Sequence, residues 1–319
     1  MFNLSGRRVF VAGHKGMVGS AVVRRLSTED CDILVADRSV LDLRSQQSVD
    51  RWMDANRPDV MVIAAATVGG ILANDSRPAD FIYDNLVIET NLIHAAHRTE
   101  VAKLVFLGSS CIYPRDADQP MREEALLTGP LEPTNQWYAI AKIAGIKMCQ
   151  AYRKQHGRDF ISAMPTNLYG PNDNFDLTSS HVLPALMRRT HMAKVEGRGS
   201  LEIWGTGTPR REFLHVDDCA DAIVFLLKAY SGDQHVNVGT GTDIAIRDLA
   251  RLIADVVGFE GDFLFDTTKP DGTPRKLMDG TRLRALGWQP RIGLSEGVRA
   301  TYAWFLANEA GLRGTRSAA

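Results

Sequence analysis

The sequence predicts an α/β protein, built on a doubly wound parallel sheet with a smaller mixed domain toward the C-terminus. Three observations support this prediction. Short, continuously apolar segments alternate with amphipathic segments through the first half of the chain. A glycine-rich turn follows the first apolar segment. The regular alternation ends after Pro171.

Five segments in the first half are apolar at successive positions instead of at every second one, which is typical of strands buried on both faces of a sheet. The strands predicted by this pattern are residues 8–12, 33–36, 60–64, 103–107 and 161–164. Helical spacing of apolar residues is found between them, at 17–26, 46–56, 79–99 and 137–155. Because strand and helix alternate, the strands are expected to run parallel in one sheet.

The second half of the chain is less regular, and its segments are expected to interleave with the sheet. Helical and strand patterns occur at 184–189, 201–204, 217–227, 235–238, 246–257 and 294–308. We assign residues 1–171, joined by 209–240, to a dinucleotide-binding domain that holds the sheet. Residues 172–208 and 241–319 are assigned to a substrate-binding domain.

The composition is that of an ordinary globular protein. Hydrophobic residues make up 45% of the 319 residues and the formal net charge is −1, so neither nucleic acid nor an anionic membrane is an expected partner. The most apolar run, residues 60–73, is too short to span a bilayer, and the N-terminus lacks the apolar core of a signal peptide. The four cysteines are scattered without paired spacing, which predicts a cytoplasmic protein with no metal site.

The first predicted strand leads into a loop with glycine at every third position, Gly13, Gly16 and Gly19. Such a loop between a strand and a helix is typical of a Rossmann-type dinucleotide site. The first two glycines let the backbone approach a pyrophosphate, and the third lets the helix pack against the strand. The N-terminus of the helix then faces the phosphates.

The cofactor is predicted to be NADP(H). Asp37 ends the second strand segment, where an acid would bind ribose hydroxyls and favour NAD. Arg38 follows it, and Lys15 lies in the glycine loop. Two cations near the ribose suit a 2′-phosphate, and this charge pairing is the stronger physical effect.

Three polar residues form a candidate catalytic group. Tyr138 and Lys142 stand four residues apart in a predicted helix, so they share one face. A lysine ammonium beside a phenol lowers the pKa of the phenol, which suits Tyr138 to exchange a proton with a carbonyl or hydroxyl group. Ser109 follows the fourth strand, at the edge where such sheets bind ligands, and can donate to the same oxygen.

The glycine loop, the serine and the Tyr-x-x-x-Lys pair resemble the extended short-chain dehydrogenase/reductase family over nearly the whole chain. Longer strings resemble the GDP-L-fucose synthases within its nucleotide-sugar branch. These strings are GHKGMVG at 13–19, SSCIYP at 109–114, EPTN at 132–135, YAIAKIAG at 138–145, PTNLYGP at 165–171, WGTGTP at 204–209 and KPDGTPRK at 269–276.

This resemblance implies NADPH-dependent 3,5-epimerisation and 4-reduction of GDP-4-keto-6-deoxy-D-mannose to GDP-L-fucose. The protons on C3 and C5 are acidic because both carbons adjoin the C4 ketone. In the family a cysteine and a histidine exchange these protons, and they match Cys111 and His181 here. Ser109 and Tyr138 would stabilise the enolate, and Tyr138 would protonate the alkoxide when hydride reaches C4.

The resemblance also implies ligand contacts along the chain. The residues that match cofactor contacts are Gly13, Lys15, Gly16, Met17, Val18, Gly19, Asp37, Arg38, Leu107, Gly108, Ser109, Ser110, Lys142, Pro165, Thr166, Asn167, Leu168 and His181. The residues that match nucleotide and diphosphate contacts are Arg189, Trp204, Arg211 and Asp271. Family members usually carry arginine at the position of Lys15 and often near Ala36, so this chain departs from the family where NADP is selected.

Other functions stay open. A GDP-colitose synthase would use the same residues on a 3,6-dideoxy sugar. A dehydratase or a simple 4-epimerase fits less well, because such enzymes favour other residues at Ser110 and Cys111. A regulator that only senses the dinucleotide would not need the Tyr138–Lys142 pair. The predicted helices 79–99 and 137–155 match the family's dimer-forming bundle, so a homodimer is expected.

Overall fold

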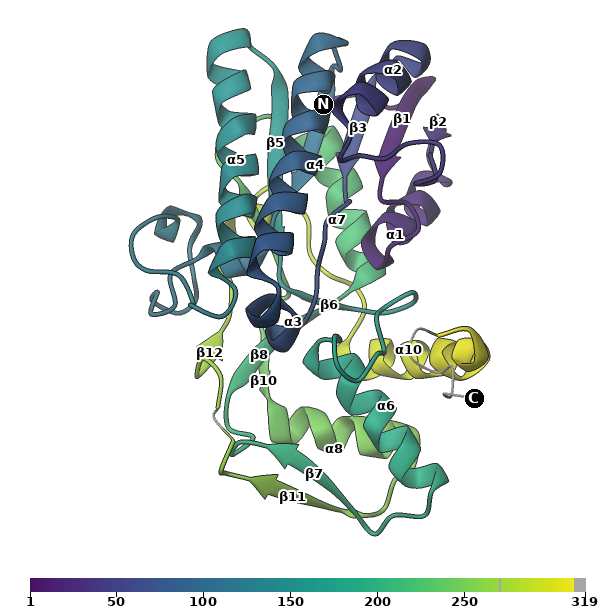
Figure 1. The fold of residues 1–319 in the computed structure, drawn as a ribbon, viewed down its shortest axis with the longest axis vertical. Helices are drawn as coiled ribbons and strands as arrows, with labels where there is room; N and C mark the ends of the chain where they lie inside the picture. Colours follow the sequence, from purple (N-terminus) through teal and green to yellow (C-terminus); the bar gives the residue numbers. More distant parts are fainter. Residues whose placement is uncertain (270, 313–319) are drawn as a thin grey trace.

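A six-stranded sheet forms the centre of the computed structural model, which describes residues 1–269 and 271–312 (Figure 1). Neighbouring strands all run parallel, in the order β2-β1-β3-β4-β5-β9. They are β1 (Arg7–Ala12), β2 (Cys31–Leu34), β3 (Val60–Ile63), β4 (Lys103–Leu107), β5 (Asp159–Pro165) and β9 (Val236–Val238). The chain passes from β1 to β2 on one side and returns to β3 on the other. The carboxyl ends of β1 and β3 therefore meet at a topological switch point, where open α/β sheets bind ligands.

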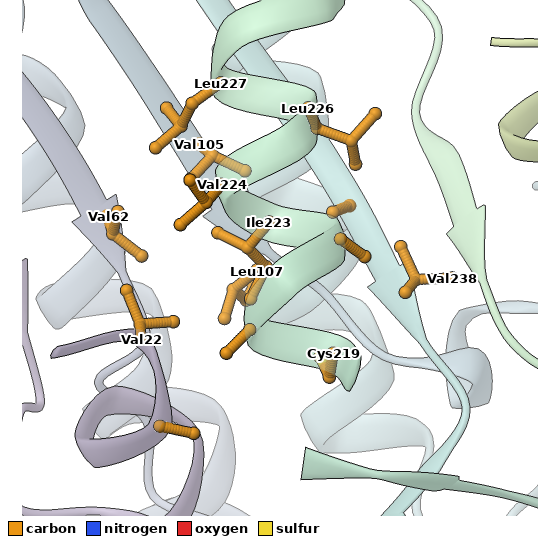
Figure 2. Close-up of a cluster of buried hydrophobic side chains, with 14 of the residues drawn as sticks. Val22, Val62, Val105, Leu107, Cys219, Ile223, Val224, Leu226, Leu227 and Val238 are labelled. Carbon is orange, nitrogen blue, oxygen red and sulfur yellow. The ribbon is translucent and has the colours of Figure 1, made fainter. Parts of the chain in front are cut away.

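Helices cover both faces of this sheet. One face is covered by α1 (Met17–Leu26) and α7 (Val216–Ala229), and the other by α2 (Gln46–Asn56), α4 (Pro78–Arg98) and α5 (Gln136–His156). On the first face, Val62 and Val105 of the sheet lie in one buried cluster with Ile223 of α7 (Figure 2). Phe10 and Phe106 point into the core on the second face. The strands thus bury both faces, as their continuous apolar runs require.

The C-terminal part consists of three helices and short strands below the main sheet in Figure 1. The helices α6 (Val182–Val195), α8 (Ile246–Val257) and α10 (Leu294–Asn308) surround a third buried cluster. Strand β7 (Ser200–Trp204) pairs with β11 (Asp262–Asp266), while β6 (Asn167–Tyr169), β8 (Arg210–His215), β10 (Asp243–Ala245) and β12 (Arg275–Lys276) form another small sheet. The remaining elements are α3 (Ile71–Ser76), α9 (Thr281–Ala285), η1 (Ser110–Ile112), η2 (Glu123–Ala125) and η3 (Glu309–Gly311).

The predicted fold class is confirmed, and the differences are concentrated in short or edge elements. The edge strand β2 begins at Cys31 and ends at Leu34, whereas the sequence predicted 33–36. Its residues are only partly buried, so its apolar pattern is a weak guide to its ends. The strands of the small sheet around β8 and the helices α3 and α9 were not predicted, because elements of two to six residues show too few turns or alternations to give a pattern.

Residues 209–240, which the sequence assigned to the dinucleotide-binding domain, lie in two places in the fold. Helix α7 and strand β9 belong to the main sheet and its cover, whereas β8 lies in the small sheet. The division into two domains stays a prediction, and Pro270 and residues 313–319 lie outside the described residues. Within residues 1–269 and 271–312, each helix is too short or too polar to cross a membrane.

The close approach of α1 to β1 generates a prediction about Gly19. A Cβ atom there would overlap the carbonyl oxygen of Gly13, so Gly19→Ala should push α1 away from the loop. We expect the free energy of unfolding to fall by about 1–3 kcal/mol in urea titrations. Gly199→Ala is the matched control, because a Cβ there has no neighbour within 4 Å among the described residues. Equal stability of the two variants would contradict the close-packing argument.

Candidate active site

The loop between β1 and α1 has the shape that a pyrophosphate needs. Gly13 has φ +87°, and a Cβ on it would lie 2.7 Å from the backbone nitrogen of Ala65. Gly16 is the N-cap of α1 and provides no side-chain cap, so the first backbone N–H groups of α1 remain available to a ligand. Because Met17, Val18 and Gly19 carry these N–H groups, the loop fits the phosphates of a dinucleotide.

Asp37 forms an ion pair with Lys15 and lies close to His14, which are contacts with the glycine loop that the sequence did not predict. Its carboxylate lies 2.7 Å from Lys15 Nζ and 3.2 Å from His14 Nε2. The hydrogen bond from Lys15 lowers the pKa of Asp37, so the acid stays ionised. Lys15 and Asp37 were interpreted as opposing signals for NADP and NAD, but their pairing neutralises much of the repulsion toward a 2′-phosphate. Arg38 is exposed beside this pair.

Two further strand ends lie along the same edge of the sheet. Leu107 ends β4, and Gly108 packs so closely on β5 that a Cβ would overlap Met164. Pro165 ends β5, and the backbone N–H of Thr166 donates to Val238 O at 3.0 Å. The predicted cofactor contacts in these segments are thus placed at the carboxyl end of the sheet, namely Leu107, Gly108, Ser109 and Ser110 after β4, and Pro165, Thr166, Asn167 and Leu168 after β5.

Tyr138 and Lys142 lie near the N-terminal end of α5, where Lys142 is only 2% exposed. Lys142 Nζ lies 5.8 Å from the centroid of the Tyr138 ring and 4.7 Å from that of Phe106. Burial raises the pKa of Tyr138 well above that of a free phenol, and charges on Cys111 and Glu89 raise it further. The predicted lowering of this pKa by Lys142 is therefore wrong, because burial of the phenol raises the pKa instead.

Cys111 is buried in the 3-10 turn η1 that follows β4. Its backbone N–H donates to Ser109 Oγ at 3.5 Å. Burial raises the pKa of its thiol, while Ser109, Lys276 and Lys142 act in the opposite direction. The thiol therefore has cationic neighbours, as a proton-transferring cysteine requires, while desolvation favours its protonated form.

His181 is the N-cap residue of α6 and is exposed. The protein that surrounds the ring nevertheless lowers its pKa by desolvation, which favours the neutral imidazole. The neighbouring Ser179 O accepts a hydrogen bond of 2.9 Å from Gly70 N. A Cβ on the adjacent Gly69 would lie 3.2 Å from Phe81, whose ring meets that of Tyr138 edge-on at 6.4 Å. The segment before His181 is therefore linked to the surroundings of Tyr138, although His181 and Cys111 share no hydrogen bond within the described residues.

Three of the four predicted nucleotide contacts lie in two different places. Arg211 lies on β8 opposite Lys276 of β12, so it belongs to the surroundings of Cys111. Trp204 is 54% exposed at the end of β7, with Lys269 Nζ 5.7 Å above its ring. Asp271 lies close by and accepts hydrogen bonds from Thr206 N and Oγ1 at 2.9 and 2.7 Å.

Arg189 and Arg211 form no ion pair with a carboxylate in the described part of the chain, although the charge of Glu202 acts on Arg189 from a longer distance. Arg189 donates to Glu202 O at 2.5 Å, and Arg211 donates to Thr273 O at 2.6 Å. Burial lowers the pKa of both guanidinium groups. A partly desolvated arginine paired only with carbonyl oxygens is suited to receive a phosphate.

Two surface hollows lie away from the predicted catalytic side chains, although Arg211 lines one of them. One, of about 370 Å³, lies between α8 and β11, and the other, of about 290 Å³, extends from Arg211 to Leu294. Tyr138, Cys111 and His181 line neither of them. The described residues also hold no group of three His, Cys, Asp or Glu side chains that could bind a metal ion. The candidate site is therefore defined by its reactive side chains at the sheet edge.

Two residues of this site were missed in the sequence. Lys276 ends the string KPDGTPRK, and its effect on the Cys111 thiol appears only when β12 pairs with β8. Glu89 is 1% exposed and lies 3.9 Å from Lys142 Nζ. Its position on the buried face of the helix, one residue after Ile88 and three before Leu92, was a signal that could have been used.

The arrangement combines a protonated phenol, a thiol with ammonium neighbours and a dinucleotide loop. A phenol can donate a proton to an oxygen that becomes negative, and a thiol can remove a proton from carbon when its charge is stabilised. The site is therefore suited to proton transfer beside a carbonyl group and to its reduction.

Comparisons with known proteins agree with this chemistry. The NAD dependent epimerase/dehydratase family matches residues 9–239. The chain is 60% identical to a GDP-L-fucose synthase of Sinorhizobium fredii, covering 97% of this chain and 99% of that protein. It is 36% identical to a GDP-L-colitose synthase of Yersinia pseudotuberculosis, covering 94% and 98%. A crystal structure of a GDP-L-fucose synthetase from Naegleria fowleri bound to NADP superposes with a TM-score of 0.90 at 27% identity, covering 98% of each chain.

The charge of Lys276 generates a prediction about the reactivity of Cys111. Because Lys276 lowers the pKa of the thiol, Lys276→Met should raise that pKa and shift the pH dependence of alkylation to higher pH. Each unit of upward shift reduces the thiolate fraction about tenfold at a pH below the pKa. Mass spectrometry of the peptide that contains Cys111, after timed treatment with iodoacetamide, measures this rate.

Lys147→Met is the matched control, because Lys147 is exposed on α5 and does not act on Cys111. Alkylation of Cys31, which is only half-buried, reports changes in the reagent or in global stability. An unchanged rate at Cys111 in Lys276→Met would show that the ammonium does not control the thiol.

Proposed function

The chain belongs to the NAD dependent epimerase/dehydratase family, and within this family we propose that it converts GDP-4-keto-6-deoxy-D-mannose to GDP-L-fucose with NADPH. The reaction inverts C3 and C5 and then reduces the C4 ketone. The family match and the GDP-L-fucose synthase relative confirm the resemblance that the sequence motifs suggested. The proposed reaction combines a reduction with two epimerisations.

One observation carries this proposal beyond a simple reduction. Cys111 is buried beside the dinucleotide site with Lys276 and Lys142 acting on its thiol. Reduction of a ketone needs a hydride and a proton donor, and it has no use for a thiol base. Inversion of a carbon beside the ketone, in contrast, requires a base on one face and an acid on the other. A thiol with cationic neighbours in this place therefore supports the epimerisation steps.

For epimerisation, we assign Cys111 and His181 as the pair that exchanges protons at C3 and C5. One of them removes the proton from carbon, and the electron pair moves onto the C4 oxygen as an enolate. Ser109 and Tyr138 donate hydrogen bonds to this oxygen. The other member of the pair returns a proton to the opposite face of the carbon, so each inversion leaves the number of protons on the sugar unchanged.

For reduction, we assign Tyr138 as the proton donor to the C4 oxygen. When bound, NADPH would supply the hydride for C4. The raised pKa of Tyr138 keeps the phenol protonated before this step, as a proton donor requires. Lys142, whose ammonium lies against the Tyr138 ring, stabilises the phenolate that remains. The same oxygen-binding groups thus serve both reactions.

NADP(H) is the proposed cofactor form. The G-x-x-G-x-x-G loop holds the pyrophosphate, and Lys15, Asp37 and Arg38 surround the position of the adenosine ribose. With Asp37 already paired to Lys15, the exposed Arg38 is available for a 2′-phosphate. The residues after β4 and β5, together with Lys142 and His181, complete the cofactor site. Comparing turnover with NADPH and NADH tests this preference.

The GDP moiety is assigned to Arg189, Trp204, Arg211 and Asp271. The two arginines can bind the diphosphate because their guanidinium groups donate to carbonyl oxygens and form no ion pair within the described residues. Trp204 offers an exposed aromatic surface, and Asp271 can accept hydrogen bonds from hydroxyl or guanine donors. A GDP-colitose precursor is the second candidate substrate, since it would engage the same residues, but the relative of that name is the more distant one.

A homodimer is proposed from the outer face of α4 and α5. Tyr83 on α4 and Ile140 on α5 are large apolar side chains that are exposed on the surface of the single chain. Packing two such helix pairs into a bundle would cover them. Light scattering at micromolar concentration should give the mass of two chains, and a monomer would contradict the proposal. We place the protein in the cytoplasm, where its four free thiols are stable.

The decisive experiment follows NADPH absorbance while the protein meets GDP-4-keto-6-deoxy-D-mannose in deuterated water. We expect NADPH oxidation and a GDP-L-fucose product that carries deuterium at C3 and C5 in its NMR spectrum. Oxidation without deuterium at these carbons would leave a simple 4-reductase. If neither NADPH nor NADH is oxidised, the GDP-colitose precursor is the next substrate.

The division of labour between Cys111 and Tyr138 gives a further prediction. Cys111→Ser should bind NADPH normally but lose most proton exchange, at least about a hundredfold, since a serine hydroxyl is far less acidic than a thiol and supplies almost no ionised base near neutral pH. Tyr138→Phe should lose reduction by a similar factor while it retains more of the exchange at C3 and C5. Deuterium incorporation and NADPH oxidation measure the two activities separately. Equal loss of both activities in each variant would contradict these roles.

A further inference from the structure

Glu89 is a carboxylic acid in an apolar environment between α4 and α5. It is 1% exposed, and neither carboxylate oxygen has a hydrogen-bond partner in the described residues. Its nearest charge is Lys142 Nζ at 3.9 Å, which is too far for a hydrogen bond. A buried carboxylate without donors is unfavourable, because burying a charge is costly unless it is paired and hydrogen-bonded. An apolar side chain would pack here at lower cost, so packing does not explain the acid.

Lys142 is as deeply buried as Glu89. Its ammonium lies between the rings of Phe106 and Tyr138, whose centroids are 4.7 and 5.8 Å from Nζ. Glu89 is the one carboxylate within ion-pair distance of Lys142 among the described residues. The aromatic rings give some stabilisation to a cation, but they supply no negative charge. Glu89 is therefore the carboxylate that stabilises the charge on Lys142, ahead of the smaller effect of Cys111.

We propose that Glu89 is a positioning residue that keeps Lys142 protonated, and thereby holds a positive charge beside Tyr138 during reduction of the substrate. This inference rests on the proposed function. Glu89 touches neither the sugar nor the cofactor in this assignment and acts only through Lys142. The pair Glu89–Lys142 has the same net charge whether the proton is on the lysine or on the acid. Only the first distribution places an ammonium next to the phenol.

The protonation of both groups supports this coupling. Burial raises the pKa of Glu89 to about 7, against the opposing charge of Lys142 and the backbone N–H of Gly145, which points to the acid without reaching hydrogen-bond geometry. Burial lowers the pKa of Lys142, against the opposing charges of Glu89 and Cys111. The other titratable groups on which Glu89 acts, Tyr138 and Cys149, also lie on α5. From strand β4, the uncharged ring of Phe106 lies in this environment.

The sign of the pH effect follows from these interactions. Without the negative charge of Glu89, the pKa of Lys142 falls and Lys142 loses its proton at lower pH. Glu89 also raises the pKa of Tyr138, so its removal lowers that pKa as well. Both changes move the alkaline loss of activity to lower pH. At acidic pH, where Lys142 remains protonated without help, the variant should resemble the wild type.

The experiment compares the rate of NADPH oxidation by wild type and Glu89→Gln across pH with GDP-4-keto-6-deoxy-D-mannose. We expect similar rates at the acidic end, and a loss in the variant that grows to about tenfold or more toward alkaline pH, as a pKa change of one unit gives. Glu89→Asp retains a carboxylate farther from Lys142 and should show an intermediate shift. Glu100→Gln, an exposed glutamate just beyond α4, should leave the profile unchanged. A loss by the same factor at every pH would show a merely structural role and overturn the proposal.

An infrared measurement tests the protonation of the Glu89–Lys142 pair without an activity assay. Difference spectra of wild-type protein between acidic and alkaline buffer should contain the C=O stretch of a buried carboxylic acid. This band should be absent in Glu89→Gln. If that variant does not fold, the band should instead shift in wild-type protein labelled with ¹³C-glutamate. Absence of a band that titrates near neutral pH would overturn the coupling. If the wild type oxidises no NADPH, the proposed function fails while the infrared result still decides the state of Glu89.

Discussion

The close packing of α5 on β4 is the contact on which the arrangement of the site depends. Gly145 makes it possible, because a Cβ at this position would overlap the ring of Phe106. One turn earlier in α5, Lys142 then lies against the same ring, with its ammonium below the surface of the protein. Tyr138 follows one turn further toward the N-terminus of α5, at the carboxyl edge of the sheet. A looser helix would let water reach Lys142 and weaken every electrostatic interaction in which it takes part.

The same sequence features that made the fold predictable made part of the site predictable. Five continuously apolar strands and four amphipathic helices gave the main sheet, and strand ends such as Ser109 and Pro165 then had to lie along one edge. Tyr138 and Lys142 could be placed on one helix face by their spacing alone. Local periodicity was sufficient for these predictions, because they concern only the order of the elements and the faces of single helices.

Lys276 and the ion pairs of Asp37 could not be inferred in this way. Lys276 reaches Cys111 because a two-residue strand pairs with β8, and nothing in the local pattern of Arg275 and Lys276 indicates a strand. The pKa of Tyr138 was predicted with the wrong sign, since the sequence shows the lysine that favours the phenolate but not the burial that opposes it. Desolvation is a property of the whole fold, and it decides the charge of groups whose partners are visible in the sequence.

Burial acts on Tyr138 and Cys111 in the same direction, although the proposed reactions require opposite protonation of the two groups. A proton donor benefits from a raised pKa, whereas a thiol base is weakened by it. The two groups can work in one dry site only if positive charge acts more strongly on the thiol. Lys276 and Lys142 both act on Cys111. Tyr138 has only Lys142 near its ring among these two lysines, and the negative charges of Cys111 and Glu89 raise its pKa. The placement of the two lysines therefore allows an acid and a base to coexist among desolvated side chains. A diphosphate bound near Arg211 would alter this balance through Lys276, which is paired with Arg211 across β8 and β12.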